Sequence, residues 1–188
     1  GYAVIKHFTG SDGDSPYAGL ALSGDTLYGT TFEGGSNGRG TVFKVNTDGA
    51  DYTVLKHVSS SGSSDGISPM GRLTLAGSTL YGTMSGGSNY SGTVFKVNTD
   101  GTDYTLLHHF SSSLGSYPGP ELALAGSTLY GTTRQGGNSG YGTVFRLNTN
   151  GTGYTVLKHF TGSDGRTPNG GLTLAGSTLY GTTYEGGS

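Results

Sequence analysis

The sequence contains no cysteine and no tryptophan in 188 residues. Without cysteine, the chain can form no disulfide, thiol nucleophile or cysteine-ligated zinc site. No apolar run approaches the roughly 18 residues that span a bilayer, so membrane insertion is not expected. Helical periodicity is also missing, because no window repeats apolar residues every three or four positions. These absences exclude several classes of protein before any motif is considered.

Charge is scarce as well. Charged residues make up 12% of the chain, and the net charge is −2. Nucleic acid is not an expected partner, because the sequence lacks the basic stripe that binds phosphates. Low charge with abundant serine, threonine, glycine and tyrosine is a tendency of extracellular proteins. We therefore expect an extracellular or cell-surface location for a secreted chain.

Three sequence blocks recur about every fifty residues. The first has the form Gly-Leu-Thr-Leu-Ala-Gly-Ser-Thr-Leu-Tyr-Gly-Thr-Thr and occurs at 19–31, 71–84, 120–133 and 171–183. The second, Gly-Thr-Val-Phe-Lys-Val-Asn, occurs at 40–46, 92–98 and, with two substitutions, 142–148. The third, Tyr-Thr-Val-Leu-Lys-His-Phe, occurs with variations at 2–8, 52–58, 104–110 and 154–160. Self-similarity at a fixed period decides the architecture of a chain.

Each repeat is expected to form four short strands joined by turns. Residues 172–175 and 179–183 typify the first two strands, and 41–45 and 52–58 the last two. The Asn-Thr-Asp-Gly sequence between the last two is a turn signal. Four antiparallel strands in about fifty residues match one propeller blade. The predicted fold is therefore all-β and β-propeller-like, with four roughly 50-residue repeats; a β-solenoid is the alternative.

The repeats form one predicted domain over residues 1–188. A fourth-strand start covers 1–10, three repeats cover 17–58, 70–110 and 120–160, and a partial repeat covers 168–188. The last blade is expected to be incomplete, because the Thr-Val-Phe strand occurs three times and the others four. Tyr2–Phe8 would be that blade's outer strand. Three explanations remain open: a longer polypeptide, an open ring, or a gap filled by another chain. An unfilled gap favours edge-to-edge association.

The blocks resemble the GloVer-type tandem repeats of bacterial surface and secreted proteins. The resemblance rests on L-Y-G-T-T-x-x-G-G (27–35, 179–187), G-T-V-F-K-V-N-T-D-G (40–49, 92–101) and Y-T-V-L-K-H-F (154–160), and it covers essentially the whole chain. It implies a propeller-like β-structure and an extracellular, envelope-anchored or secreted location. It implies no established enzymatic activity.

Histidines and acids are the first candidates for chemistry. The histidines, one or two per repeat near the end of the fourth strand, are His7, His57, His108, His109 and His159. Positions repeated once per blade lie around a ring, which favours packing over a metal site. The aspartates of the Asn-Thr-Asp-Gly turns are Asp48, Asp51, Asp100 and Asp103. The third copy has Asn150 and Gly153 instead, so we interpret these turns as structural rather than calcium-binding.

Other polar residues give weaker signals. Asp12, Asp14, Asp65 and Asp164 lie in the loops before the first strands, where they could share a cation on one face of the ring. No nucleophile elbow or phosphate loop occurs, and glycine pairs precede strands rather than helices. We therefore predict no catalytic residue, no metal and no cofactor.

Tyrosines give the best binding signal. Tyr28, Tyr81, Tyr130 and Tyr180 recur in every repeat and are expected to pack in the core or between blades. Five others break the repeat in or beside loops: Tyr17, Tyr90, Tyr117, Tyr141 and Tyr184. Variable loops carry specificity on a rigid scaffold, and an exposed tyrosine suits stacking on a sugar. Asn89 and Asn150 lie in sequons and are possible glycosylation sites.

Three functions follow from these observations. The first is a non-catalytic extracellular module for structure or adhesion, with a surface filament or matrix subunit as one version. Its partners would be copies of itself or other surface proteins. The second is a lectin-like propeller that binds glycans through the loop tyrosines. The third is an enzyme with a site in a central channel, which the absence of catalytic motifs disfavours.

Overall fold

The computed structural model describes residues 1–59, 66–86 and 91–187. These residues form strands, turns and loops, which confirms the all-β prediction. No helix within the described ranges is long and apolar enough to cross a bilayer. In the described part of the chain, sixteen strands are arranged as four antiparallel sheets, and each sheet corresponds to one repeat.

The first blade contains β1 (Ala21–Ser23), β2 (Thr26–Thr31), β3 (Thr41–Asn46) and β4 (Thr53–His57), hydrogen-bonded in that order. Its connections follow from the turn residues. Gly49 has a φ of 88° and donates its N–H to the Asn46 carbonyl at 2.8 Å, which closes the turn between β3 and β4. Consecutive strands therefore form a meander.

The second and third blades repeat this meander and add one short strand each. The second contains β5 (Ile67–Pro69), β6 (Thr74–Ala76), β7 (Thr79–Gly86), β8 (Thr93–Asn98) and β9 (Thr105–His109). The third contains β10 (Ser116–Pro118), β11 (Ala123–Ala125), β12 (Thr128–Gln135), β13 (Thr143–Asn148) and β14 (Thr155–His159). β5 and β10, which the repeat pattern did not predict, pair with the far ends of β7 and β12.

The last blade has two strands, β15 (Thr173–Ala175) and β16 (Thr178–Tyr180). The sequence predicted a second strand over 179–183, but β16 ends at Tyr180. In the other blades the equivalent strand is six to eight residues long and pairs with a third strand. In the last blade, the described residues provide no third strand, so the ladder stops early.

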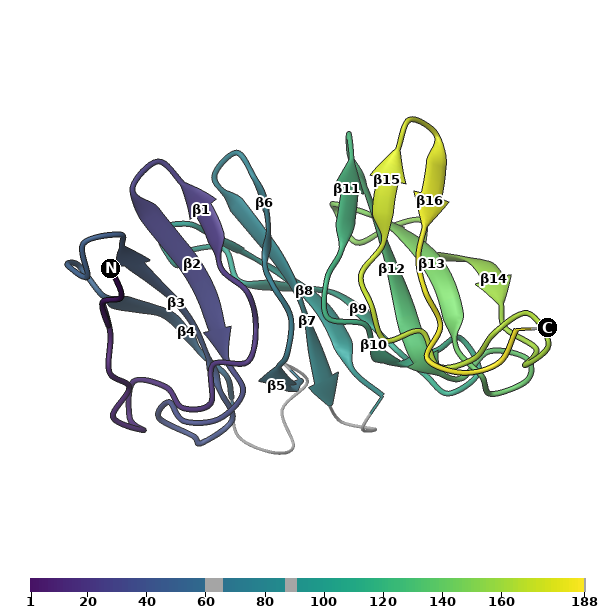
Figure 1. Ribbon diagram of the computed structural model, residues 1–188, viewed down its shortest axis with the longest axis horizontal. Coiled ribbons are helices and arrows are strands. Elements are labelled where there is room, and N and C mark those ends of the chain that lie inside the picture. Colours follow the sequence, from purple (N-terminus) through teal and green to yellow (C-terminus); the bar gives the residue numbers. More distant parts are fainter. Residues whose placement is uncertain (60–65, 87–90, 188) are drawn as a thin grey trace.

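The four sheets follow one another in an open row, and the two termini lie at opposite ends of its long axis (Figure 1). Residues 1–10 form no strand, contrary to the expected fourth-strand start. Tyr2–Phe8 also lies away from the last blade. It lies against the first, where the Phe8 ring centroid is 5.3 Å from that of Phe43 and 6.0 Å from that of Tyr52. The described residues therefore do not close a ring.

The hydrophobic core lies between blades. One buried cluster joins the first and second blades, and another joins the second and third. Tyr28 and Tyr81 are buried at these interfaces, as expected for inter-blade packing. Their equivalent in the last blade, Tyr180, is 58% exposed. The difference follows from position, because no blade follows the last one in the described chain.

Candidate functional site

The fourth strand of each blade contacts the next blade through a β-bulge. In the first blade, Val42 pairs with Lys56 and Phe43 with Val54, which leaves Leu55 as the extra residue. Leu55 lies against the turn of the second blade: a Cβ added at Gly101 would be 3.2 Å from the Leu55 carbonyl oxygen. The same contact joins Leu107 to Gly151, and Ile5 to Gly49. Glycine is therefore required where one blade meets the next.

The residue after the bulge covers a tyrosine of the next blade. The Lys56 Nζ is 4.1 Å from the Tyr104 ring centroid, and the Lys6 Nζ is 4.0 Å from that of Tyr52. In the second blade, histidine replaces lysine, and the His108 ring lies 3.9 Å from the Tyr154 ring, centroid to centroid. These cation–π and stacking contacts bind successive blades at their outer strands.

Threonine hydroxyls bond the blades on their inner strands. Thr30 Oγ1 donates to the Gly71 carbonyl at 3.2 Å, and Thr83 Oγ1 to the Gly119 carbonyl at 2.9 Å. The third member of the series, Thr132, donates to Gly170 at 3.3 Å. The donors lie in β2, β7 and β12, and the acceptors lie shortly before β6, β11 and β15 of the next blade. Equivalent positions of successive repeats therefore make equivalent contacts with the next blade.

All three series end at the last blade. Leu157, equivalent to Leu55, is 46% exposed, and Thr182, equivalent to Thr30, is also exposed. Lys158, equivalent to Lys56, forms an ion pair with Asp164. That hydrogen bond lowers the pKa of the Asp164 carboxyl to about 2. We call the surface formed by Leu157, Lys158, Leu179, Gly181 and Thr182 the open face.

The open face contains a cavity of about 350 Å³ between the third and last blades. It is lined by Thr132, Val144, Leu157, Lys158, Phe160, Asp164, Pro168, Leu172, Leu179, Gly181, Thr182 and Thr183. Apolar side chains and the ion pair of Lys158 with Asp164 both line it.

In the neighbouring blades, a phenylalanine occupies the position that corresponds to this cavity. A Cβ added at Gly29 would lie 2.6 Å from the tip of the Phe43 ring, and Gly82 and Gly131 have the same relation to Phe95 and Phe145. Gly181 is the fourth such glycine. Its nearest neighbour is Leu172, at 2.8 Å from an added Cβ. The cavity therefore lies where the other blades place the phenylalanine of their third strand.

The loop tyrosines do not form a single site. Tyr17 is 74% exposed beside Phe32 in the first blade, with ring centroids 5.7 Å apart. Tyr117 belongs to β10, where its N–H donates to the Ser91 carbonyl of the preceding blade at 2.8 Å. Tyr90 lies outside the described residues.

Tyr141 and Tyr184 are brought together across the third and last blades. The N–H of Thr167 donates to the Tyr141 carbonyl at 2.9 Å, and the Tyr184 N–H donates to the Thr167 carbonyl at 3.1 Å. Arg166 lies 5.9 Å from the Tyr141 ring centroid and forms an ion pair with Glu185. An exposed aromatic ring therefore lies beside a charged pair, an arrangement that offers stacking and hydrogen bonding to a ligand.

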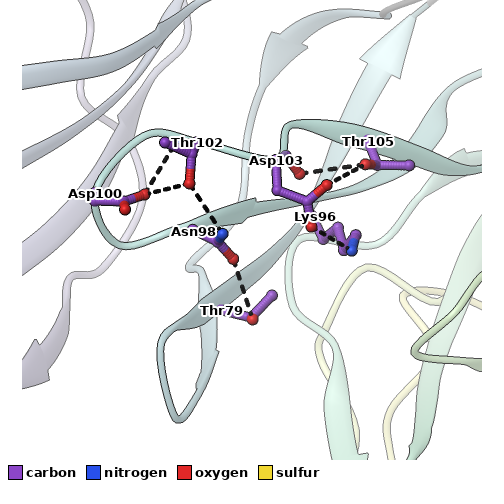
Figure 2. Close-up of polar contacts among 7 residues, drawn as sticks. All are labelled: Thr79, Lys96, Asn98, Asp100, Thr102, Asp103 and Thr105. Atoms are coloured by element: carbon purple, nitrogen blue, oxygen red, sulfur yellow. Dashed lines mark hydrogen bonds and ion pairs between the residues drawn. The ribbon is translucent and has the colours of Figure 1, made fainter.

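The aspartate turns are held by internal hydrogen bonds (Figure 2). Asp100 Oδ1 accepts from the N–H of Thr102 at 2.9 Å and from its hydroxyl at 2.6 Å, and these bonds lower the pKa of Asp100. Asn150 accepts the same two bonds from Thr152 at 3.0 and 2.7 Å. Because an amide replaces the carboxylate without loss of the contacts, the turn does not depend on the charge.

Asp103, in the same turn, pairs with Lys96 at 2.7 Å. At the loop position predicted to share a cation, Asp12 pairs with Lys6 in the first blade, as Asp164 does with Lys158 at the other end of the row. The hydrogen bond from Lys6 lowers the pKa of Asp12 to about 2. Asp12, Asp103 and Asp164 are therefore placed in separate ion pairs, and Asp65 lies outside the described residues.

Two histidines hold the glycine-rich loops. His57 Nδ1 accepts the Ser36 N–H at 3.1 Å, and His159 Nδ1 accepts the Asn138 N–H at 3.2 Å. Within the described ranges, no group of three or more histidine, aspartate or glutamate side chains could hold a metal ion. Of the two sequons, Asn150 is exposed in its turn, and Asn89 lies outside the described residues.

Sequence reasoning identified the incomplete last blade as an edge that favours association, but it did not identify the residues that form the open face. The third strand occurs three times and its glycine partner four times, and Gly181 is the unmatched member. The loop tyrosines were selected because they differ between repeats. That criterion does not identify the open face, whose residues follow the repeat pattern.

Comparisons with known proteins agree with this architecture. The family model described as the Gloeobacter/Verrucomicrobia repeat matches residues 1–188. No curated protein sequence matches the chain. Among solved structures, a chain of the nidogen/laminin complex is 19% identical with a TM-score of 0.60, over 85% of this chain and 52% of that one. TolB from Acinetobacter baumannii is 18% identical with a TM-score of 0.55, over 96% of this chain and 43% of that one.

These neighbours are β-propeller-like, which confirms the predicted fold class. At this level of identity the likeness concerns the fold alone. The chain spans about half the length of the structures that it matches.

Proposed function

The chain belongs to the Gloeobacter/Verrucomicrobia repeat family, and from this membership and its open row of β-blades we propose that it is a non-catalytic extracellular module for structure or adhesion. The observation that carries the proposal is the open face. Its residues repeat an interface that elsewhere in the chain joins one blade to the next. A surface that repeats an internal interface is suited to association.

The exposed groups of the open face support this role. Leu157 is 46% exposed and lines an apolar cavity, whereas its equivalent Leu107 is 8% exposed beneath the next blade. Burying apolar surface contributes about 25 cal/mol per Å², so covering this face would stabilise an assembly. Among the described residues, no strand pairs with the outer edge of β16, and its backbone donors and acceptors could be satisfied by another strand.

The location and the partners belong to the same proposal. A charged content of 12%, with abundant serine, threonine, glycine and tyrosine, supports a secreted or cell-surface location. The partners would be copies of this chain or other surface proteins, and a filament or matrix subunit is one form of this role. No cofactor is needed for it.

Size-exclusion chromatography with light scattering, followed by negative-stain imaging, tests the proposal. We expect the mass to rise above 19.1 kDa with concentration, and rows of particles to form. Leu157→Asp should suppress the assembly, because it places a charge in the apolar wall of the cavity. Leu114→Asp, at a 43% exposed loop position, is the matched control. A monodisperse monomer at high concentration would contradict self-association.

A second candidate function is glycan binding at Tyr141 and Tyr184. The observation that favours it is the ion pair of Arg166 with Glu185 beside the Tyr141 ring, next in sequence to the exposed Tyr184. A glycan array would test it, with a Tyr141→Ala/Tyr184→Ala double variant against Tyr17→Ala in the first blade. Loss of signal in the double variant alone is expected, and no binding to any arrayed sugar would exclude those sugars as ligands.

A further inference from the structure

Residues from three blades line a second cavity, with a volume of about 310 Å³. This volume lies at the lower end of the range for small-molecule pockets, which is about 300–1,000 Å³. Leu22 of β1 lines it from the first blade, Leu75 of β6 from the second, and Leu122, just before β11, from the third. Among the described residues, none lines both this cavity and that of the open face.

Two charged residues that line this cavity depart from the repeat. The four copies of the first block have, at the position before the first leucine, Gly19, Arg72, Glu121 and Gly171. These positions lie side by side across the blades. A Cβ added at Gly19 would be 3.7 Å from Arg72 Cδ, and one added at Gly171 would be 2.9 Å from Glu121 Cβ. With glycine on either side, the two charged side chains are 52% and 43% exposed. Residues that differ between repeats are where a rigid scaffold can carry specificity.

The Arg72 guanidinium is oriented by the first blade but keeps hydrogen-bonding capacity. Its Nε donates to the Leu20 carbonyl at 3.2 Å, across the blade boundary. Its Nη1 lies 3.5 Å from Glu121 Oε1, whereas charge-assisted hydrogen bonds are about 2.7–2.9 Å long. The ion pair of Lys96 with Asp103, in the same blade, is 2.7 Å long. Because a guanidinium has several donors and a carboxylate several acceptor sites, both groups of the long pair can also bind a ligand.

The adjacent charges indicate the kind of ligand that fits. A cation beside an anion complements a molecule that has an anion beside a cation, as an α-amino acid has in its carboxylate and ammonium. A ligand with a single charge would meet a like charge, either Glu121 or Arg72, and such contacts are unfavourable. Leu22 is 58% exposed and offers apolar surface for the rest of the ligand to cover.

We propose that this cavity binds a free α-amino acid with an apolar side chain. The ligand carboxylate pairs with Arg72, its ammonium pairs with Glu121, and its side chain lies against Leu22 and Leu75. The ligand then contacts the first three blades at once. This activity goes beyond the structural role proposed above and does not depend on it.

Isothermal titration calorimetry of the full 188-residue chain with L-leucine, L-methionine and L-phenylalanine tests the site. We expect saturable one-to-one binding. Two analogues of leucine each lack one charge: 4-methylpentanoate lacks the ammonium, and 3-methylbutylamine lacks the carboxylate. Each should bind about 10-fold or more weakly than leucine, because one charged contact is lost and the remaining charge lies near a like charge.

Substitutions test the same two contacts from the protein. Arg72→Gln and Glu121→Gln should each weaken leucine binding about 10-fold or more, since each removes one charged partner of the ligand. Lys96→Gln is the matched control, because it breaks an ion pair in the same blade and Lys96 does not line the cavity. Its affinity for leucine should equal that of the wild type. Exposed ion pairs contribute little to stability, so circular dichroism and the unfolding midpoint should show that all three variants are folded.

Three results would each overturn the proposal. If none of the three amino acids binds, Arg72 and Glu121 form an inter-blade ion pair only. If 4-methylpentanoate binds as tightly as leucine, the cavity is an anion site in which Glu121 has no part. If leucine binding survives both Arg72→Gln and Glu121→Gln, the ligand binds elsewhere. None of these results bears on the self-association of the open face, which size-exclusion chromatography measures separately.

Discussion

The His108 ring lies parallel to the Tyr154 ring across the boundary between the second and third blades, with centroids 3.9 Å apart and planes 7° from parallel. Lysine occupies this position in the two preceding copies of the heptad, over Tyr52 and Tyr104. One interface therefore has an imidazole where the two others have a lysine. We expect pH to act on this blade boundary through the half-buried imidazole.

Acid should destabilise the chain through His108. Burial, with His109 adding like charge, lowers the pKa of His108 from 6.5 to about 4. Between those values the unfolded chain binds a proton that the folded chain does not, so stability present at neutral pH is lost as pH falls. After discounting for solvent screening of a half-buried group, we expect about 1 kcal/mol.

Urea unfolding at several pH values checks this loss. His108→Lys should remove the step between pH 6.5 and 4, because an ammonium can lie over Tyr154 as Lys56 lies over Tyr104. His7→Gln, in the exposed part of the first heptad, should retain the step. Identical pH profiles for the wild type and His108→Lys would show that another group is responsible.

The Asp100 turn should tolerate loss of charge but not loss of the acceptor. Asp100→Asn retains an oxygen for the Thr102 N–H and hydroxyl, as Asn150 does for Thr152, so the unfolding midpoint at pH 7 should stay near that of the wild type. Asp100→Ala removes the acceptor and should lower the midpoint. Calcium or EDTA should shift the midpoint of none of these proteins. A rise with calcium that Asp100→Asn abolishes would restore the metal interpretation of this turn.

Much of the fold could be predicted because turn signals at fixed positions mark the ends of the strands in each repeat. The Asn-Thr-Asp-Gly turn and the alternation in Thr-Val-Phe-Lys-Val-Asn define β3, β8 and β13 to within one residue of the predicted bounds. The placement of Tyr2–Phe8 could not be predicted in this way. Its side chains suit an outer strand in any blade interface, and the contact of Phe8 with Phe43 determines which interface it joins.

The sequence predicts the candidate site only as the place where one strand is missing. Counting strands shows that one Thr-Val-Phe strand is missing, but the consequence depends on a contact between distant residues. Gly181 resembles every other glycine in the Leu-Tyr-Gly-Thr block until the pairing of Gly82 with Phe95 is known. Periodicity reports which positions are equivalent, whereas the structure reports which of them lack their partner.

Removing one inter-blade hydroxyl should cost stability in the interior of the row but not at its end. Thr83 is 4% exposed and donates to the Gly119 carbonyl at 2.9 Å, so Thr83→Val leaves a buried acceptor unsatisfied and should cost about 1–2 kcal/mol. Thr182→Val is the matched control at the equivalent exposed position and should be nearly neutral. Guanidinium unfolding measures both, and equal losses would mean that the hydroxyl acts within its own strand.

Replacing a glycine that faces the third-strand phenylalanine by alanine should cost more stability than the same change in the last blade, where that phenylalanine is missing. At Gly82, a Cβ would lie 2.5 Å from the tip of the Phe95 ring and 2.9 Å from Leu73, so Gly82→Ala overpacks the second blade. We expect a loss of about 1–3 kcal/mol, because a close-packed interior cannot absorb the extra volume without shifting side chains.

Gly181→Ala makes the same change where Leu172 is the one neighbour within 4 Å of an added Cβ, at 2.8 Å. Leu172 is partly exposed and can rotate, so the loss should be well under half of that at Gly82. Gly82 lies in β7, Gly181 directly follows β16, and neither has a positive φ, so we expect similar effects on backbone entropy and take the difference as a measure of the missing ring. Thermal and urea unfolding of the pair give that difference directly. If the two substitutions cost the same, the cavity beside Gly181 is closed in solution.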